Sequence, residues 1–243
     1  MEWFSSWFNS PYYHLLYKNR NEEEATLFVS KIVQFFQITS QDHLLDLACG
    51  KGRHSINLQK TGAHVWGLDI APESIAYANQ FAHEKLHFGV HDMRNPIPNA
   101  PFNYIFNLFT SFGYFETEAE EQLSIQNMAN ALTTDGKLLI DFLNIGLIEK
   151  CLIPQEIKEI EGVKFEISKK IENGFIIKDI KFTDKGADYQ FQEKVKALSY
   201  QDFNQYLLKA GLTINKVFGD YELNEFELTT SPRLILICSK ISA

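Results

Sequence analysis

The chain has 243 residues, of which 45% are hydrophobic and 22% charged, and its formal net charge is −8. This balance is typical of a folded globular protein and argues against a disordered chain. The negative charge argues against a nucleic-acid partner, because that affinity rests largely on Lys and Arg that neutralise phosphates. No apolar run approaches the length of a membrane span and no secretory leader is evident, so we expect a cytoplasmic protein without a membrane partner.

The three cysteines, Cys49, Cys151 and Cys238, are far apart in the sequence. They form neither a CxxC pair nor a Cys/His pattern, so we expect no disulfide framework and no bound metal. Free thiols of this kind agree with a reducing compartment.

The first part of the chain alternates short apolar runs with amphipathic segments. The apolar runs predict strands at 43–48, 64–69, 86–90, 104–109 and 137–142. The amphipathic segments predict helices at 21–37, 53–60, 72–82 and 117–132. Strands that alternate with helices indicate a doubly wound, Rossmann-like α/β fold, in which a mostly parallel sheet is covered on both faces.

Past residue 155 the apolar period changes to two. Apolar and polar residues alternate over 163–167 and again over 176–182, and Asn173-Gly174 between them is typical of a hairpin turn. We therefore expect a small antiparallel β insertion at 155–198, which either roofs an acceptor site or forms a dimer contact.

After the insertion we expect a last helix at 199–211 and two strands at 213–218 and 233–239. The sequence contains no internal repeat and no long linker. We therefore expect one domain over residues 1–243, present as a monomer or a homodimer.

The loop that follows the first expected strand contains Gly50 and Gly52. In open α/β sheets, ligands bind beyond the carboxyl ends of the strands, and glycines there let the backbone approach a ligand closely. Asp69 ends the second expected strand, where its carboxylate can accept hydrogen bonds from ribose hydroxyls. The pattern predicts a site for a nucleoside.

Two residues distinguish a nicotinamide dinucleotide from S-adenosylmethionine (SAM) as the ligand. The dinucleotide pattern needs a third Gly or Ala where Ser55 stands, and Asp46 precedes the glycines, where a carboxylate would repel a pyrophosphate. A carboxylate there suits the ammonium and sulfonium charges of SAM. An NAD(P)-dependent oxidoreductase is the alternative function.

Residues 46–52, Asp-Leu-Ala-Cys-Gly-Lys-Gly, resemble motif I of the class I SAM-dependent methyltransferases. Later motifs follow in the order of that family. Residues 68–73 resemble the acidic motif that holds the ribose, 91–93 the motif that contacts the adenine amino group, and 107–112 the motif that faces the methyl donor. Residues 231–236 are similar to the antiparallel last strand of the family fold.

The resemblance implies a seven-stranded, mostly parallel sheet whose last strand is antiparallel, with SAM as the cofactor. Residues 13–20 resemble the lid segment of the glycine and sugar-amine N-methyltransferase branch, so we expect lid helices within residues 1–38. The motifs imply that the cofactor-binding residues are Tyr13, Tyr17, Arg20, Asp46, Ala48, Cys49, Gly50, Gly52, Asp69, Ile70, Asp92, Met93, Asn107 and Phe109.

The resemblance predicts a methyltransferase with a small-molecule acceptor. The fourth motif lacks the Asn/Asp-Pro-Pro-Tyr of enzymes that methylate nucleobase amines, which argues further against nucleic acid. A deprotonated amine needs no enzyme base, whereas a hydroxyl acceptor does, and both stay open. Candidate bases are His91, Tyr114 and Glu116. A non-catalytic SAM-binding protein is a further alternative.

Overall fold

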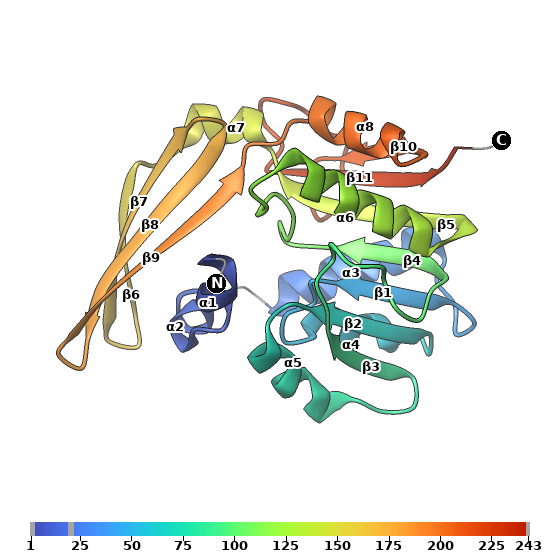
Figure 1. Ribbon diagram of the computed structural model, residues 1–243, viewed down its shortest axis with the longest axis horizontal. Coiled ribbons are helices and arrows are strands. Elements are labelled where there is room, and N and C mark those ends of the chain that lie inside the picture. Colours follow the sequence, from blue (N-terminus) through green and yellow to red (C-terminus); the bar gives the residue numbers. More distant parts are fainter. Residues whose placement is uncertain (1–2, 19–21, 242–243) are drawn as a thin grey trace.

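The computed structural model describes residues 3–18 and 22–241. Its main sheet has the strand order β10-β11-β5-β4-β1-β2-β3 (Figure 1). The strands are β1 (His43–Leu47), β2 (His64–Asp69), β3 (Leu86–Val90), β4 (Phe102–Asn107), β5 (Leu132–Leu143), β10 (Leu212–Phe218) and β11 (Arg233–Lys240). Neighbouring strands from β3 to β5 pair in parallel, and β11 pairs antiparallel with both β5 and β10. The expected seven-stranded sheet with an antiparallel last strand is confirmed.

Helices cover both faces of this sheet. They are α3 (Glu22–Phe36), α4 (Arg53–Gln59), α5 (Pro72–Ala78), α6 (Glu118–Ala131) and α8 (Tyr200–Lys209). One core packs α6 and α8 against the sheet through residues such as Met128 and Phe203, and the other packs α3, α4 and α5 through residues such as Phe28 and Leu58. Burial on both faces explains why the central strands read as continuous apolar runs.

The beginnings of two helices follow directly from their sequence. The Thr117 hydroxyl accepts from the Glu120 backbone N–H, and the Glu120 carboxylate accepts from the Thr117 N–H in return. Ser199 and Asp202 form the same capping box at the start of α8. Each box satisfies backbone N–H groups that the first turn of a helix leaves without a partner.

A second sheet, which we call the insertion sheet, has the strand order β6-β7-β8-β9 and is antiparallel throughout. Its strands are β6 (Gln155–Ile160), β7 (Val163–Glu172), β8 (Phe175–Asp184) and β9 (Ala187–Lys196). The hairpin turn expected at Asn173-Gly174 joins β7 to β8. The alternation of residues did not predict β6, because this edge strand is mostly exposed on both faces and carries little apolar signal. Helix α7 (Ile145–Cys151), before the insertion sheet, was also not predicted.

Two short helices, α1 (Trp3–Phe8) and α2 (Pro11–Leu16), lie between the insertion sheet and the main sheet (Figure 1). We call residues 3–18 the leader. Trp7 and Leu16 join Phe165 and Ile180 in a third hydrophobic core. This core belongs to the leader and the insertion sheet and is separate from the two cores of the main sheet.

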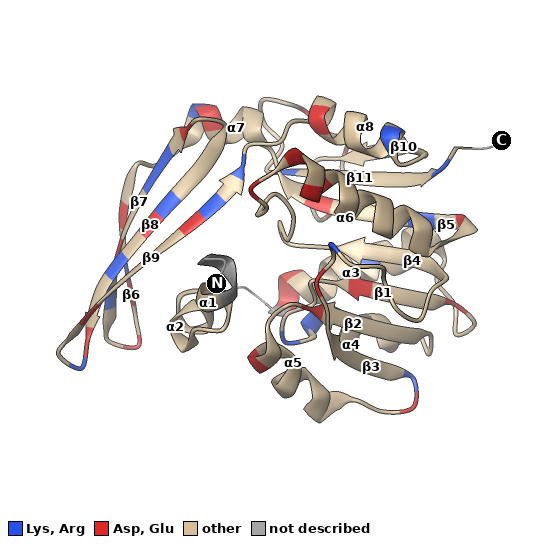
Figure 2. Ribbon diagram, viewed as in Figure 1, with Lys and Arg blue, Asp and Glu red and all other residues tan. Residues whose placement is uncertain are grey.

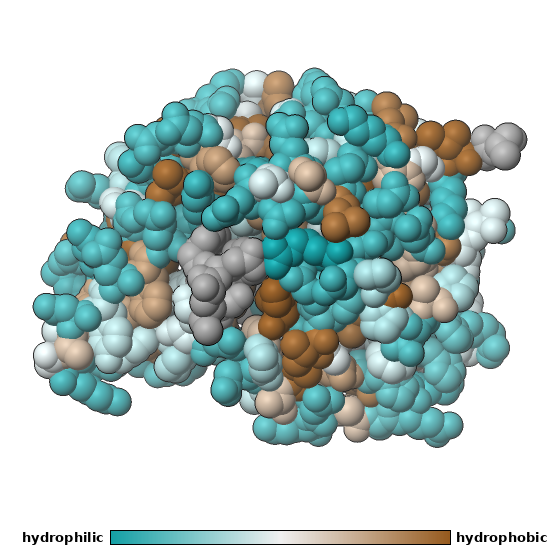
Figure 3. Space-filling model, in the orientation of Figure 1, coloured by the Kyte–Doolittle hydropathy of each residue, from teal (hydrophilic) through white to brown (hydrophobic). Residues whose placement is uncertain are grey.

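Hydrophilic residues cover much of the face drawn in Figure 3, and a group of apolar residues lies in the region of α5. Lys and Arg alternate with Asp and Glu along the strands of the insertion sheet (Figure 2). Over residues 3–18 and 22–241, none of the helices combines the length and the apolar character that a membrane crossing requires.

Candidate functional site

A cavity of about 570 Å³ lies at the carboxyl ends of β1, β2 and β4, and we call it the first cavity. The loops after these strands and the leader form its walls, as expected for a doubly wound sheet. The expected cofactor residues that line it are Tyr13, Tyr17, Ala48, Cys49, Gly50, Asp69, Ile70, Asp92, Met93 and Phe109. The candidate bases His91 and Tyr114 line it as well, whereas Glu116 is exposed outside its wall.

Three other expected cofactor residues lie beneath the wall of the first cavity. Asp46 is 1% exposed, and Asn107 is fully buried. The Asn107 amide donates to the carbonyl of Leu47 at 3.0 Å, so it supports the end of β1. Gly52 faces the ring of Phe88. Arg20 lies outside the described residues.

The loop between β1 and α4 turns sharply over the end of β2. Ala48, Gly50 and Gly52 have φ values of 64°, 56° and 81°, in the left-handed region. The N–H groups of Ala48 and Cys49 both donate to the Leu68 carbonyl, at 2.6 and 3.0 Å. A Cβ atom added to Gly50 would enter open space, so bare backbone borders the cavity there.

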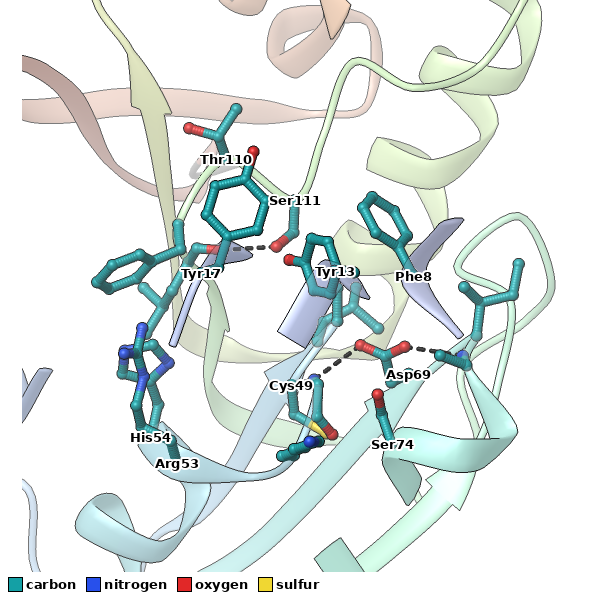
Figure 4. Close-up of a pocket in the computed structure, with 18 of the residues that line it drawn as sticks. Phe8, Tyr13, Tyr17, Cys49, Arg53, His54, Asp69, Ser74, Thr110 and Ser111 are labelled. Carbon is teal, nitrogen blue, oxygen red and sulfur yellow. Dashed lines mark hydrogen bonds between the residues drawn. The ribbon is translucent and has the colours of Figure 1, made fainter. Parts of the chain in front are cut away.

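Asp69 holds this loop and lines the first cavity at the same time (Figure 4). One carboxylate oxygen accepts from the Gly50 N–H at 2.7 Å, and the other accepts from the Ala71 N–H at 2.8 Å. Burial raises the pKa of Asp69 above its ordinary value, and these backbone bonds oppose that rise. Because a carboxylate offers about four acceptor positions, two bonds leave capacity for a ligand.

Asp92 lies in a pair with Arg94, a residue that the motifs did not indicate. The Arg94 guanidinium binds Asp92 at 2.6 Å and Glu120 at 2.8 Å, and it lies over the Phe115 ring. Burial acts to raise the pKa of Asp92, but the Arg94 bonds outweigh it and hold that pKa below its ordinary value. Asp92 is therefore an anion at neutral pH.

Phe109 is the centre of a stacked wall that the sequence did not reveal. The Arg53 guanidinium lies 4.5 Å from its ring centroid, the His54 ring lies at 4.9 Å and the Tyr221 ring at 5.3 Å. Burial, with a smaller effect of the Arg53 charge, lowers the pKa of His54 to about 3. The Nε2 atom of His54 is buried without a hydrogen-bond partner in the described chain.

The two candidate bases that line the first cavity, His91 and Tyr114, differ in what their polar atoms do. Burial lowers the pKa of His91, although the Asn95 backbone and the Asp92 charge oppose this effect. The Tyr114 hydroxyl donates to the Thr110 carbonyl at 2.6 Å, so its proton is committed within the protein. The Tyr114 ring meets Phe8 of the leader edge to face, with 5.4 Å between centroids.

A second cavity, of about 590 Å³, adjoins the first. Phe109, Thr110, Tyr114 and Glu193 line both cavities. The remaining walls are mostly apolar side chains of α7 and the insertion sheet, with a few charged groups. The charged residues that line the second cavity are Glu24, Lys169, Lys178, Glu193 and Arg233.

A buried carboxylate fixes the shared boundary of the two cavities. Phe109 and Thr110 both have φ values of 59°, which is rare for residues other than glycine. The Phe109 N–H donates to an Asp141 carboxylate oxygen at 2.9 Å, and the Thr110 N–H donates to the Asp141 backbone carbonyl at 3.0 Å. Arg233 donates to Asp141 at 2.7 Å and to the Thr110 hydroxyl at 2.8 Å. These bonds hold a strained turn between the cavities.

The family model described as "Methyltransferase domain" matches residues 38–194 of the chain. A dTDP-3-amino-3,4,6-trideoxy-alpha-D-glucopyranose N,N-dimethyltransferase of Streptomyces venezuelae is 26% identical over 132 residues, which are 53% of this chain and 54% of that protein. The chain thus spans about half the length of that relative. A putative methyltransferase of Geobacillus sp. (strain WCH70) is 21% identical, over 88% of this chain and 90% of that protein.

Solved structures share the fold over nearly the whole chain. A SAM-dependent methyltransferase from Clostridium acetobutylicum has a TM-score of 0.79 at 20% identity, with 95% of this chain and 96% of that chain covered. The sugar N-methyltransferase KedS8 from Streptoalloteichus has a TM-score of 0.74 at 20% identity, with 95% and 93% covered.

Proposed function

This chain belongs to the methyltransferase domain family and is a class I SAM-dependent methyltransferase, and on that premise we propose that it methylates an amine of a small molecule. The acceptor amine lies at the shared boundary of the two cavities, with the rest of the molecule in the second cavity. Amino sugars are the first class to test, because the Streptomyces venezuelae relative and the KedS8 structure are both named for methyl transfer to sugar amines.

One observation carries this proposal: the two cavities meet at Phe109, Thr110, Tyr114 and Glu193. In-line methyl transfer needs donor and acceptor on opposite sides of one reacting carbon, and such alignment accounts for roughly 7–11 kcal/mol of rate enhancement. A second cavity of about 590 Å³ suits a small molecule. The mixed charges of the insertion sheet give no extended basic face for a phosphate backbone (Figure 2).

The residues of the first cavity fit SAM. We assign Asp69 to the ribose hydroxyls, since its carboxylate keeps free acceptor positions, and Asp92 to the adenine amino group. The open space beside Gly50 admits the ligand against bare backbone. Bound SAM supplies an electrophilic methyl group on a sulfonium. The rings of Tyr13 and Phe109 can exclude water, and the Tyr13 ring can face that cation.

The protonation of the site favours an amine over a hydroxyl acceptor. A hydroxyl must lose its proton to a base, whereas a neutral amine attacks with its own lone pair. The lowered pKa of His91 makes it a weak base, and the Tyr114 hydroxyl is committed to Thr110. Neither candidate base is well suited to activate an alcohol, which supports N-methylation.

We propose that the leader is a lid over the first cavity. Phe8 and Tyr13 lie across the cavity from Asp69 (Figure 4). Asn9 also contacts the main domain, where its side-chain oxygen accepts from the Glu73 N–H at 3.3 Å. The insertion sheet then forms part of the roof of the acceptor site. A non-catalytic SAM-binding protein is the competing hypothesis, and the second cavity argues against it.

Two measurements test the proposal. Thermal unfolding should shift upward with SAM or S-adenosylhomocysteine (SAH) and stay unchanged with NAD or NADP. Methyl transfer from labelled SAM should then be measured with a panel of amino sugars and their hydroxyl counterparts at equal concentration. We expect label in amines; label only in the hydroxyl compounds would overturn N-methylation, and binding of SAH without transfer to any compound would favour the non-catalytic hypothesis.

A further inference from the structure

The leader is attached to the insertion sheet more extensively than to the main domain. Beyond their shared hydrophobic core, polar contacts join the two: the Tyr12 hydroxyl donates to Asp184 at 2.8 Å, and Lys18 pairs with Glu161. The leader forms part of the wall of the first cavity. Residues more than 140 positions later in the chain therefore hold that part of the wall in place.

The most buried of these polar contacts surround Glu193 on β9. The Trp7 indole N–H donates to Glu193 Oε1 at 2.8 Å. The Tyr17 hydroxyl lies 2.6 Å from Oε1 and 2.8 Å from Oε2. The Lys178 ammonium lies 3.4 Å from Oε2, contacts the Tyr17 hydroxyl, and stacks over the Tyr17 ring. One carboxylate thus joins α1, the end of the leader and strand β8.

Glu193 lies where the first and second cavities meet. Tyr17 lines the first cavity and Lys178 lines the second, and Glu193 lines both. Among the residues common to the two cavities, Glu193 carries the formal charge. Its side chain is only 15% exposed, so its hydrogen bonds lie in a partly water-excluded site where they are strengthened.

We propose that Glu193 is a positioning residue that, by binding Trp7 and Tyr17, holds the leader over the first cavity and so slows release of the cofactor. The inference rests on the proposed function, because it assigns the first cavity to SAM. A carboxylate suits the role because both of its oxygens accept, and they face the donors Trp7, Tyr17 and Lys178. A glutamine would turn one oxygen into an NH₂ group that faces a donor.

Calorimetric titration with SAH tests this role through a double-mutant cycle. Glu193→Gln and Tyr17→Phe should each weaken SAH binding by about tenfold, as expected for loss of a charge-assisted hydrogen bond. The double variant should bind about as weakly as the weaker single variant, because both changes remove the same contact. Glu166→Gln, on an exposed side chain of β7, is the matched control and should bind SAH like the unaltered protein.

Stopped-flow measurement of SAH release separates positioning from general destabilisation. Glu193→Gln and Tyr17→Phe should each release SAH about tenfold faster, and Tyr17→Phe, which keeps the Glu193–Lys178 ion pair, should keep a melting temperature without ligand close to that of Glu166→Gln. Unchanged affinity and release rate in Glu193→Gln, or additive losses in the double variant, would overturn the inference. If Glu193→Gln does not fold, Tyr17→Phe alone decides, since it removes a single hydroxyl. Failure of the unaltered protein to bind SAH would instead refute the cofactor assignment of the first cavity.

Discussion

The Ser55 hydroxyl donates to the Asp46 carboxylate at 2.6 Å beneath the glycine loop. Asp46 is the penultimate residue of β1 and Ser55 lies in the first turn of α4, so this bond joins the strand to the helix across the loop. Both residues are buried, at 1% and 0% exposure. The two positions that argued against a dinucleotide in the sequence are thus partners in one contact.

The Asp46–Ser55 pair predicts an unusual pH dependence of stability. Burial raises the pKa of Asp46 from 3.8 to about 6, against the opposing effect of the Ser55 bond. Between about pH 4 and 6 the folded chain keeps a proton that the unfolded chain has released, so this group's contribution to the free energy of unfolding falls as pH rises. An asparagine does not titrate in this range, so Asp46→Asn abolishes this fall in stability with rising pH.

The stability of Asp46→Asn relative to the unaltered protein should therefore increase by on the order of 1–3 kcal/mol between pH 4 and pH 7. Urea unfolding at closely spaced pH values measures this difference. A difference that stays constant over that range would mean that the Asp46 pKa is not raised in the folded state.

The two loop glycines provide a matched pair. Both have positive φ, so alanine costs about 1 kcal/mol of backbone strain at either position. At Gly52 the added Cβ would lie 2.6 Å from the Phe88 ring, whereas at Gly50 it would meet nothing within 4 Å. Gly52→Ala should therefore lose roughly 2–4 kcal/mol of stability in total, and Gly50→Ala about 1 kcal/mol.

SAH binding should be weakened more by Gly50→Ala than by Gly52→Ala, which is the opposite order to their effects on stability. Gly50 lines the first cavity, so Gly50→Ala should weaken SAH binding by about tenfold or more, since the methyl group occupies ligand space. Urea unfolding and calorimetry of both variants check the pair. Equal losses of stability together with equal losses of affinity would contradict the different surroundings of the two positions.

Asp69→Asn should weaken SAH binding by one to two orders of magnitude, on the order of 1.5–3 kcal/mol. The amide would lose acceptor capacity for the ribose and would turn an NH₂ group toward the Gly50 or Ala71 N–H. Calorimetric titration measures the change, with Asp135→Asn at an exposed position of β5 as the control. An unaltered dissociation constant would rule out the ribose assignment.

Removing only one partner of the Arg233–Asp141 ion pair should lower the free energy of unfolding. Arg233→Met leaves the fully buried Asp141 carboxylate without its cation and should lose about 3–5 kcal/mol of stability. Adding Asp141→Asn to that variant should recover part of the loss, because the unpaired charge disappears. Chemical unfolding of the single and double variants checks this, and a double variant less stable than Arg233→Met would contradict it.

Local patterns in the sequence determined the main fold. Alternating apolar runs and capped helices at 43–142 predicted the parallel part of the sheet, because burial on both faces and capping are local properties. The glycines and Asp69 predicted the nucleoside site for a related reason. In a parallel sheet, every strand ends at the same edge, so the order of motifs in the chain already implies that their loops converge.

Only the tertiary structure decided which distant segments share a wall. The sequence indicated the leader and the insertion separately, but not that Trp7 and Glu193 hold them together across 186 positions. It also did not indicate that His54 and Arg53 pack on Phe109, or that Asp141 and Arg233 hold the turn at Thr110. Such contacts depend on how separate elements pack in three dimensions. Hydrophobic periodicity predicts single helices and strands, but it does not predict which polar residues of different elements pair.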